Sequence, residues 1–226
     1  NALISVHKGG RVEPNVRATV QEIYQGLIVT SQNSWPNLKF DALAINDIAA
    51  PFLSAGFYYK TFMWPPRFWE ALYEPIIRRA AGLGRLDPKT DDDNYDQNFL
   101  FCDLLIIGGG PSGLLSALLT ARAGLDVILV DENANLGGQL RFENTTIDGD
   151  HCKDWVDRCL VELQSLDNVR MISRATVFGI YDQGTFGVIE RLSHHVQHTH
   201  NDAVVDRFHR IVASASILAS GSIERH

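Results

Sequence analysis

The sequence predicts an α/β fold: a Rossmann-like parallel sheet with an antiparallel β-meander, preceded by an irregular, aromatic-rich N-terminal arm. Two short apolar runs, Leu104–Ile107 and Val127–Val130, have the profile of strands buried on both faces of a parallel sheet. A glycine-rich turn and an unbroken run of small and apolar residues, 114–123, join them. Three alternating segments after residue 175 predict the meander.

The turn after the first strand has glycines at the spacing Gly108-x-Gly110-x-x-Gly113. Gly108 permits a sharp turn from strand to helix, Gly110 lets the backbone approach a pyrophosphate, and Gly113 lets the helix pack against the strand. The alternative is a glycine turn in an unrelated βαβ unit that binds no ligand. The flanking strands, the helix and the acid after the second strand favour a dinucleotide site.

The N-terminus of the predicted helix offers free N–H groups and a partial positive charge to phosphates. Pro111 and Ser112 lie at this point of the chain, and we count them with the three glycines as expected cofactor-binding residues. Gly124 is expected to end the helix as a C′ residue.

Asp131 ends the second strand, 18 residues beyond Gly113. A carboxylate at this position accepts hydrogen bonds from a ribose 2′-hydroxyl and repels a 2′-phosphate. NAD or FAD is therefore favoured over NADP. Gly137 and Gly138, further along the chain, suit a second close approach of the backbone to a ligand.

The rest of the domain is expected to complete the sheet. Helical periodicity covers residues 154–166, and a third parallel strand follows at 169–172. The meander strands and a last buried strand that leads to a small-residue turn are expected at 176–181, 185–192, 204–214 and 215–219.

The chain is expected to contain three regions. They are an arm or connector with short strands and one or two helices over 1–86, an acidic linker over 87–101, and the dinucleotide-binding domain over 102–226. The linker is predicted because Leu86–Gln97 holds five aspartates and almost no apolar residues. Both ends of the sequence fall within predicted strands or turns, so we expect a fragment of a longer protein, with the last domain incomplete at its C-terminus.

The arm contains an unusual aromatic segment, Ala55–Tyr73, in which eight of 19 residues are aromatic. Pro65 and Pro66 forbid one continuous helix, so an extended stretch and then a helix from Pro66 to about Ala81 are expected. The aromatic side chains either pack as ordinary core or form a docking surface for another subunit. We expect part of the segment to be buried by other regions of a full complex.

Composition excludes several classes of function. A formal charge of −7 and a pI near 5.6 argue against nucleic-acid or anionic-membrane binding, because no basic stripe offsets phosphate repulsion. No apolar run approaches the ~20 residues of a membrane span, and no secretory signal is visible. A cytoplasmic location is therefore expected.

The residues that could ligate a metal or form disulfides give no site. Cys102, Cys152 and Cys159 form neither a CxxC pair nor a zinc spacing, which suits free thiols in a reducing compartment. The His-rich stretch from His194 to His200 is best explained as a solvated hairpin loop. No metal is expected.

The order of these elements resembles the two-dinucleotide-binding flavoproteins, which include thioredoxin reductase and glutathione reductase. Ala219-Ser220-Gly221 is similar to the ATG motif of that family, with Ser in place of Thr. Gly137-Gly138-Gln139-Leu140 resembles the GGQL of thioredoxin reductases, but no redox CxxC accompanies it.

A closer resemblance, to the alpha subunit of heterotetrameric sarcosine oxidase, covers nearly the whole chain. It rests on long, specific stretches: NALISV, EPN-R-AT (13–19), GL (26–27), SQNSWPNL (31–38), AGFYYKTFMWP (55–65), AAGLG (80–84) and GSIER (221–225). The family's alpha subunit is far longer. His226 departs from the Pro that the family tends to have.

The resemblance implies a complex that oxidatively demethylates sarcosine to glycine, reduces O₂ to H₂O₂ and passes the one-carbon unit to tetrahydrofolate. It implies FAD in the beta subunit, FMN at the alpha–beta interface, NAD on the alpha-subunit fold, and gamma and delta subunits as further partners. The implied NAD site adds Glu132, Gly138, Ala219, Ser220 and Gly221 to the glycines and Asp131. No catalytic residue is assigned, because the family oxidises the amine on another chain.

Three alternatives remain at this point. One is a self-contained FAD-dependent disulfide reductase or NADH oxidase that uses the same site. Another is a non-catalytic scaffold. The third is the alpha subunit of a related dehydrogenase that acts on proline, opines or glycine.

Overall fold

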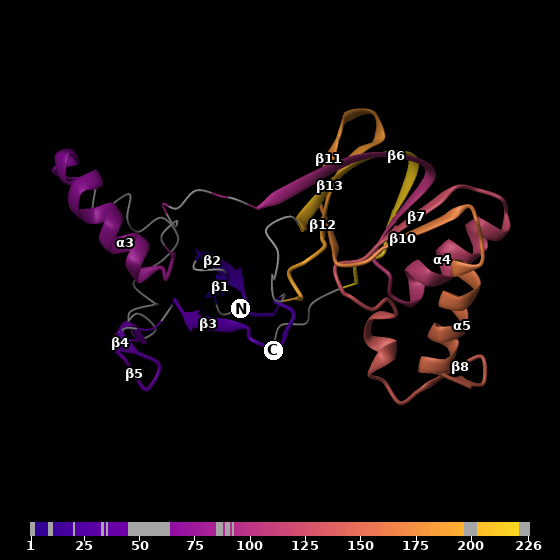
Figure 1. The fold of residues 1–226 in the computed structure, drawn as a ribbon, viewed down its shortest axis with the longest axis horizontal. Coiled ribbons are helices and arrows are strands. Elements are labelled where there is room, and N and C mark those ends of the chain that lie inside the picture. The colour runs from indigo at the N-terminus through magenta and orange to yellow at the C-terminus, as the bar shows by residue number, and fades with distance from the viewer. Residues whose placement is uncertain are drawn as a thin grey trace. The chain divides into compact units, whose positions relative to one another are not determined.

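A computed structural model describes residues 3–8, 11–19, 21–32, 34, 36–44, 64–84, 88, 91, 93–196 and 203–221. The chain forms two compact units (Figure 1). We call them the N-terminal unit, 1–92 with 194–200, and the C-terminal unit, 93–193 with 201–226. In the described part of the chain, no helix is long and apolar enough to cross a membrane.

The N-terminal unit contains a three-stranded antiparallel sheet in the order β2-β1-β3. Its strands and those of a small hairpin are β1 (Leu3–Lys8), β2 (Arg11–Arg17), β3 (Ile28–Ser31), β4 (Pro36–Asn37) and β5 (Phe40–Asp41). A short 3-10 turn, Ala42–Ala44, follows the hairpin. All four residues of β3 are exposed, so this sheet has little apolar packing along that strand.

A helical segment follows the prolines of the N-terminal unit, as predicted. It starts as a 3-10 turn at Pro66–Phe68, continues as a π-helical turn at Trp69–Tyr73, and ends as α3, Glu74–Ala80. Pro66 is the first helical residue, where the missing N–H costs no hydrogen bond. Most of the predicted aromatic arm, 55–63, lies outside the described residues.

The C-terminal unit is built on a six-stranded sheet in the order β10-β7-β6-β13-β12-β11, which confirms the predicted α/β fold class. The four strands from β10 to β13 are parallel, and β12 and β11 add an antiparallel meander. The strands are β6 (Asn94–Ile107), β7 (Val127–Val130), β10 (Val169–Ile172), β11 (Ala175–Tyr181), β12 (Thr185–Arg191) and β13 (Val204–Leu218).

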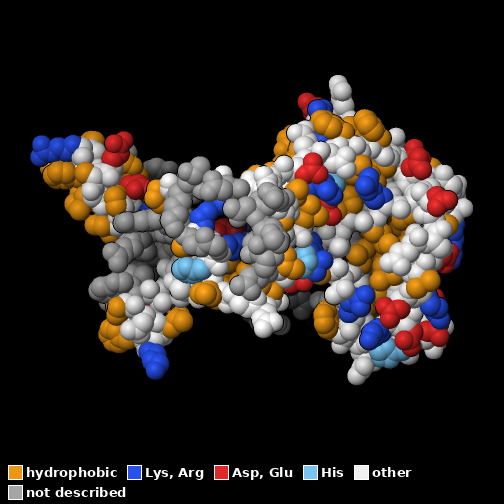
Figure 2. All heavy atoms as spheres, viewed as in Figure 1, with side chains coloured by type: hydrophobic (Ala, Val, Ile, Leu, Met, Phe, Trp, Pro, Cys, Tyr) orange, Lys and Arg blue, Asp and Glu red, His pale blue; other side chains and the backbone are white. Residues whose placement is uncertain are grey.

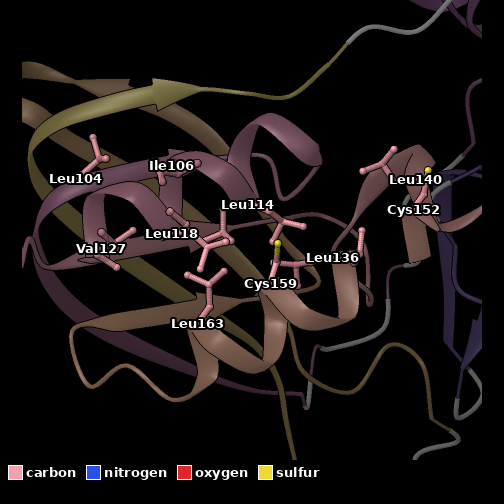
Figure 3. Close-up of a cluster of buried hydrophobic side chains, with 14 residues drawn as sticks. Leu104, Ile106, Leu114, Leu118, Val127, Leu136, Leu140, Cys152, Cys159 and Leu163 are labelled. Atoms are coloured by element: carbon pink, nitrogen blue, oxygen red, sulfur yellow. The ribbon is translucent and has the colours of Figure 1, made fainter. Parts of the chain in front are cut away.

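Two helices cover one face of this sheet, α4 (Pro111–Arg122) and α5 (Cys152–Gln164). Figure 3 shows their apolar side chains packed on the strands, with Leu114 and Leu118 of α4 and Leu163 of α5 beside Ile106 and Val127. A short 3-10 helix and a two-strand hairpin precede α5: Gly138–Arg141, β8 (Thr146–Ile147) and β9 (Asp150–His151).

The other face of the sheet is covered by residues of the meander. Leu105, Ile128 and Val130 pack there against Phe186 and Val188. The end of β6, residues 104–107, and the whole of β7 therefore have apolar partners on both faces, which explains why these stretches are continuous apolar runs rather than alternating ones.

Two predictions about element boundaries are wrong. Strand β6 begins at Asn94, within the predicted linker over 87–101, because β13 offers it a partner from Val204 onward. The predicted strands 204–214 and 215–219 are one strand, β13, since that same pairing continues to Ile107. The last part of β13 is also not buried: the side chain of Leu218 is 73% exposed.

Candidate dinucleotide-binding site

The turn after β6 is closed by contacts that leave no room for a side chain at its first glycine. Gly108 has φ +109°, and its N–H donates to the carbonyl of Val130 at 2.8 Å. A Cβ at Gly108 would lie 2.3 Å from the carbonyl oxygen of Ala219. Both the backbone conformation and the space therefore require glycine here.

The third glycine of the motif brings the helix close to the turn. A Cβ at Gly113 would lie 1.9 Å from the carbonyl oxygen of Gly108. Gly113 and Ala117 of α4 are both buried. Close packing between α4 and the strand, which the motif predicts for this position, is therefore present.

Gly110 differs from the other two, because it faces open space. It is the N-cap of α4, with φ −72°, and a Cβ built on it meets no atom within 4 Å. Conformational freedom is thus not the reason for glycine at this position. An added side chain would instead fill the space in front of the helix.

The N-terminus of α4 has polar groups available for a ligand. No side chain caps it, and Pro111 occupies the first helical position. The N–H groups of Ser112 and Gly113 belong to the first turn, which has no acceptors within the helix. Pro111 and Ser112 are exposed, so an anion can approach these groups from solvent.

Asp131 is held against the glycine turn. Its side chain is only 8% exposed, and its Oδ2 accepts a hydrogen bond from the N–H of Gly109 at 2.6 Å. Its Oδ1 accepts from the backbone N–H of Asn133 at 2.7 Å and from Nδ2 of the same residue at 2.9 Å. The carboxylate therefore lies beside the loop where the dinucleotide is expected.

Asn133 belongs to the site although no sequence motif predicts it. A signal was present in principle, since an aspartate can accept a hydrogen bond from the backbone N–H two residues later and so form a local turn. Glu132, which the family resemblance implies as a site residue, has an exposed side chain. The structure does not place it against the turn.

The second glycine pair also lies against the turn. The N–H of Gly137 donates to the carbonyl of Gly109 at 2.7 Å. Gly138 has φ +55°, and a Cβ on it would lie 3.2 Å from Cα of Gly110. Gly138 therefore lies beside the space in front of α4.

The last segment of the site is the turn that follows β13. The N–H of Ala219 donates to the carbonyl of Ile107 at 2.7 Å, and the backbone nitrogen of Ser220 is 2.9 Å from the Cβ position of Gly108. Gly221 has φ +67° and no atom within 4 Å of its Cβ position. The structure thus brings Asp131, Gly138, Ala219 and Ser220 together around the glycine turn, whereas the side chain of Glu132 is exposed.

The cysteines do not form a redox centre. All three are free and buried, and burial raises the pKa of the Cys102 thiol to about 11. A thiol with such a pKa is a poor nucleophile at neutral pH. Among the described residues, no cluster of His, Cys, Asp or Glu could hold a metal ion; His198 and His200 lie outside them.

Comparison with known proteins agrees with this geometry. Residues 103–214 match the family of FAD dependent oxidoreductases. Over all of its length the chain is 52% identical to the sarcosine oxidase alpha chain of Rhizobium meliloti. It is also 36% identical, over 64% of its length, to the corresponding sarcosine oxidase chain of a Corynebacterium species.

A more distant relative is a chain of the opine oxidase from Agrobacterium tumefaciens, which is 30% identical over 55% of this chain and 25% of that one. Among solved structures, an L-proline dehydrogenase from P. horikoshii is similar, with 21% identity and a TM-score of 0.44 over 63% of this chain and 26% of that one.

The chain spans only part of the sarcosine oxidase relatives: 23% of the Rhizobium chain and 15% of the Corynebacterium one. The family assignment therefore concerns the aligned region. Because that region covers every residue of this chain at 52% identity, the chain belongs to the family of sarcosine oxidase alpha subunits, and its residues 103–214 form a domain that matches the FAD dependent oxidoreductase family.

Proposed function

We propose that the C-terminal unit binds a dinucleotide in front of the N-terminus of α4, with NAD as the first candidate and FAD as the alternative. The observation that supports this most is the open space at Gly110. It is the one glycine of the motif whose missing side chain is not explained by packing or by φ, so a ligand explains it best.

The residues around this space suit the parts of a dinucleotide. The pyrophosphate would lie at Gly110, Ser112 and Gly113, where free N–H groups and the helix dipole favour negative charge. Asp131 would accept a hydrogen bond from a ribose hydroxyl. Gly138 and the turn of Ala219, Ser220 and Gly221 would border the phosphates, with Glu132 nearby at the surface.

The carboxylate of Asp131 disfavours a 2′-phosphate, but it does not separate NAD from FAD, because both contain the same ADP half. The family match is to FAD-dependent oxidoreductases, which supports FAD. The resemblance to the sarcosine oxidase alpha chain supports NAD. Either group, when bound, supplies two-electron redox chemistry; the residues described here bind and orient it.

At the level of the whole protein, we propose a cytoplasmic complex that oxidatively demethylates sarcosine to glycine, reduces O₂ to H₂O₂ and transfers the one-carbon unit to tetrahydrofolate. The relatives are named as alpha subunits, which supports the presence of partner subunits; beta, gamma and delta subunits are those we propose. FAD and FMN would then be held elsewhere in the complex. We assign no catalytic residue to this chain.

The dinucleotide can be identified directly. The full alpha subunit, purified in its complex, is denatured, and the released nucleotides are identified by mass spectrometry and counted per complex. The variant Gly110→Val should lose the dinucleotide of this site, because its methyl groups fill the ligand space while its φ of −72° suits any residue.

The matched control is Ala123→Val, which adds two methyl groups at the exposed far end of α4. It should keep full occupancy. Equal occupancy in Gly110→Val and in the control would refute the proposed site. Assays of the complex with sarcosine, proline and an opine then test the proposed substrate independently of the site.

A further inference from the structure

We infer that Asn133 is a positioning residue, which fixes the carboxylate of Asp131 so that it accepts a single ribose hydroxyl and selects dinucleotides with a free 2′-hydroxyl. This inference rests on the proposed function and deepens it. Neither the glycine motif nor the acid at the end of β7 identifies Asn133; only the hydrogen bonds of the structure do.

The protein already occupies most of the acceptor capacity of Asp131. A carboxylate offers about four lone-pair sites. Three are filled: Gly109 N–H donates to Oδ2, and the backbone N–H and Nδ2 of Asn133 both donate to Oδ1. About one site on Oδ2 is left for a ligand, so we expect one hydroxyl contact and not a bidentate one.

Asn133 is itself fixed by the backbone. Its carbonyl accepts a hydrogen bond from the N–H of Arg174 at 3.0 Å, and the carbonyl of Asp131 accepts from Ala175 at 2.9 Å. Both bonds join the loop after β7 to the start of β11. The side-chain amide of Asn133 therefore starts from a fixed point and can hold Oδ1 in one orientation.

The other side of the carboxylate explains a further glycine, the one between the motif's first two. A Cβ at Gly109 would lie 3.1 Å from Oδ2 of Asp131 and 2.9 Å from Leu136. A side chain at this position would press on the carboxylate and on the loop beside it. Gly109 and Asn133 thus each bond a different oxygen of the carboxylate.

The choice of Asn at position 133 has an electrostatic reason. Its amide donates to the carboxylate without adding charge, so Asp131 keeps its full negative charge toward the ligand. With Glu132 next to it, that charge opposes a 2′-phosphate. An Asp at position 133 would remove the Nδ2 donor and add a repelling charge, although its size is nearly the same.

The test compares ADP with 2′-deoxy-ADP, because they differ only in the hydroxyl in question. Binding to the full alpha subunit, freed of its cofactor, is measured by calorimetry. In the unmodified protein, ADP should bind about tenfold more tightly than 2′-deoxy-ADP, the scale of one hydrogen bond to a charged group. In Asn133→Ala, this ratio should fall to about two or less.

The same loop supplies a matched control. Asn135 is exposed, and Asn135→Ala should keep the tenfold ratio. In Asn133→Asp, the ratio of the affinities for ADP and 2′-deoxy-ADP should fall as it does in Asn133→Ala. This variant replaces the alanine variant if thermal unfolding shows that the latter is unstable. A ratio that stays near ten in both Asn133 variants overturns the inference and leaves the proposed site intact. If the unmodified protein binds neither nucleotide, the proposed function fails as well.

Discussion

The two units of the chain differ in how they pack their apolar residues. The C-terminal unit buries many of them in two clusters, one on each face of its sheet, although others, such as Phe142 (89% exposed), lie at its surface. In the described part of the N-terminal unit, Val6 is the only buried hydrophobic residue, while Ile23 is 88% and Trp64 is 83% exposed. Figure 2 shows hydrophobic side chains at the surface along α3.

This difference shows that composition alone does not make a core. The apolar residues of the C-terminal unit recur with the periods of strands and helices, so they meet on shared faces when the elements pack. Those of the N-terminal unit follow no sustained period. Many of those that the structure describes lie at the surface.

The largest expected effect is the loss of a core side chain in the C-terminal unit. Leu129 is fully buried in β7, and Leu129→Ala should reduce the free energy of unfolding by about 3 kcal/mol, through lost transfer energy and a residual cavity. Ile23→Ala in the N-terminal unit should change it by less than about 0.5 kcal/mol. Denaturant titration of both variants measures the contrast; equal losses would mean that the units do not differ in packing.

The next effect separates folding from binding within one turn. Gly113→Ala places a methyl group 1.9 Å from a backbone oxygen, so the chain must shift, at a cost of about 2 kcal/mol of stability. Gly110→Ala meets no atom and should leave stability unchanged, but it should weaken dinucleotide binding. Thermal unfolding and nucleotide titration of the pair check this. Equal stability in the two variants would contradict the packing role of Gly113.

A smaller effect on stability is expected in the helical segment of the N-terminal unit. Trp64 and Ile76 are exposed, so the double variant Trp64→Ser, Ile76→Ser should change the free energy of unfolding by no more than about 0.5 kcal/mol. We expect it to reduce self-association of the isolated chain, measured by sedimentation velocity. If the variant unfolds instead, these side chains belong to the unit's own core.

The smallest effect concerns the ion pair between α4 and α5. Arg122 Nε and Nη2 donate to the two carboxylate oxygens of Glu162 at 2.6 and 2.7 Å. These hydrogen bonds lower the pKa of Glu162, so its contribution to stability is present above the ordinary glutamate value, roughly pH 4.3, and is lost as the pH falls through the lowered pKa.

The stability difference between the unmodified protein and Glu162→Gln should therefore be small at pH 7 and should vanish as the pH falls below about 4. Thermal unfolding across this range measures it. A difference that grows toward low pH would contradict the assigned direction of the pKa shift.

Local patterns were sufficient to predict two of the parallel strands, β7 and β10, and the helices α4 and α5. Strands β7 and β10 begin and end at the predicted residues, because each is a short apolar run between turn residues. Helix α5 begins two residues before its predicted start, since Cys152 joins the buried face. The start of β6 was not predicted, because the aspartates around it are typical of a solvated linker. The alternation of exposed Phe99 and Phe101 with buried Leu100 and Cys102 is the strand signal in this part of the chain.

The sequence motif predicted which residues form the candidate site, but not the contacts that these residues make with other parts of the chain. The motif predicts a sharp turn at Gly108 and an open approach at Gly110, but it does not predict that Ala219, far away in sequence, fills the space at Gly108. The hydrogen bonds between Asp131 and Asn133 likewise depend on a side-chain orientation that no periodicity records.

The continuity of β13 has a consequence for how such chains can change in length. After a register shift between Val204 and Asp206, this strand pairs regularly with β6 as far as Leu218, and the carbonyl of the next residue, Ala219, fills the space at Gly108. A single inserted or deleted residue would turn the following side chains to the opposite face and move Ala219 out of place. We therefore expect no variation in length among related proteins between Asp206 and Ala219, where the register is regular, and expect such variation only before Asp206.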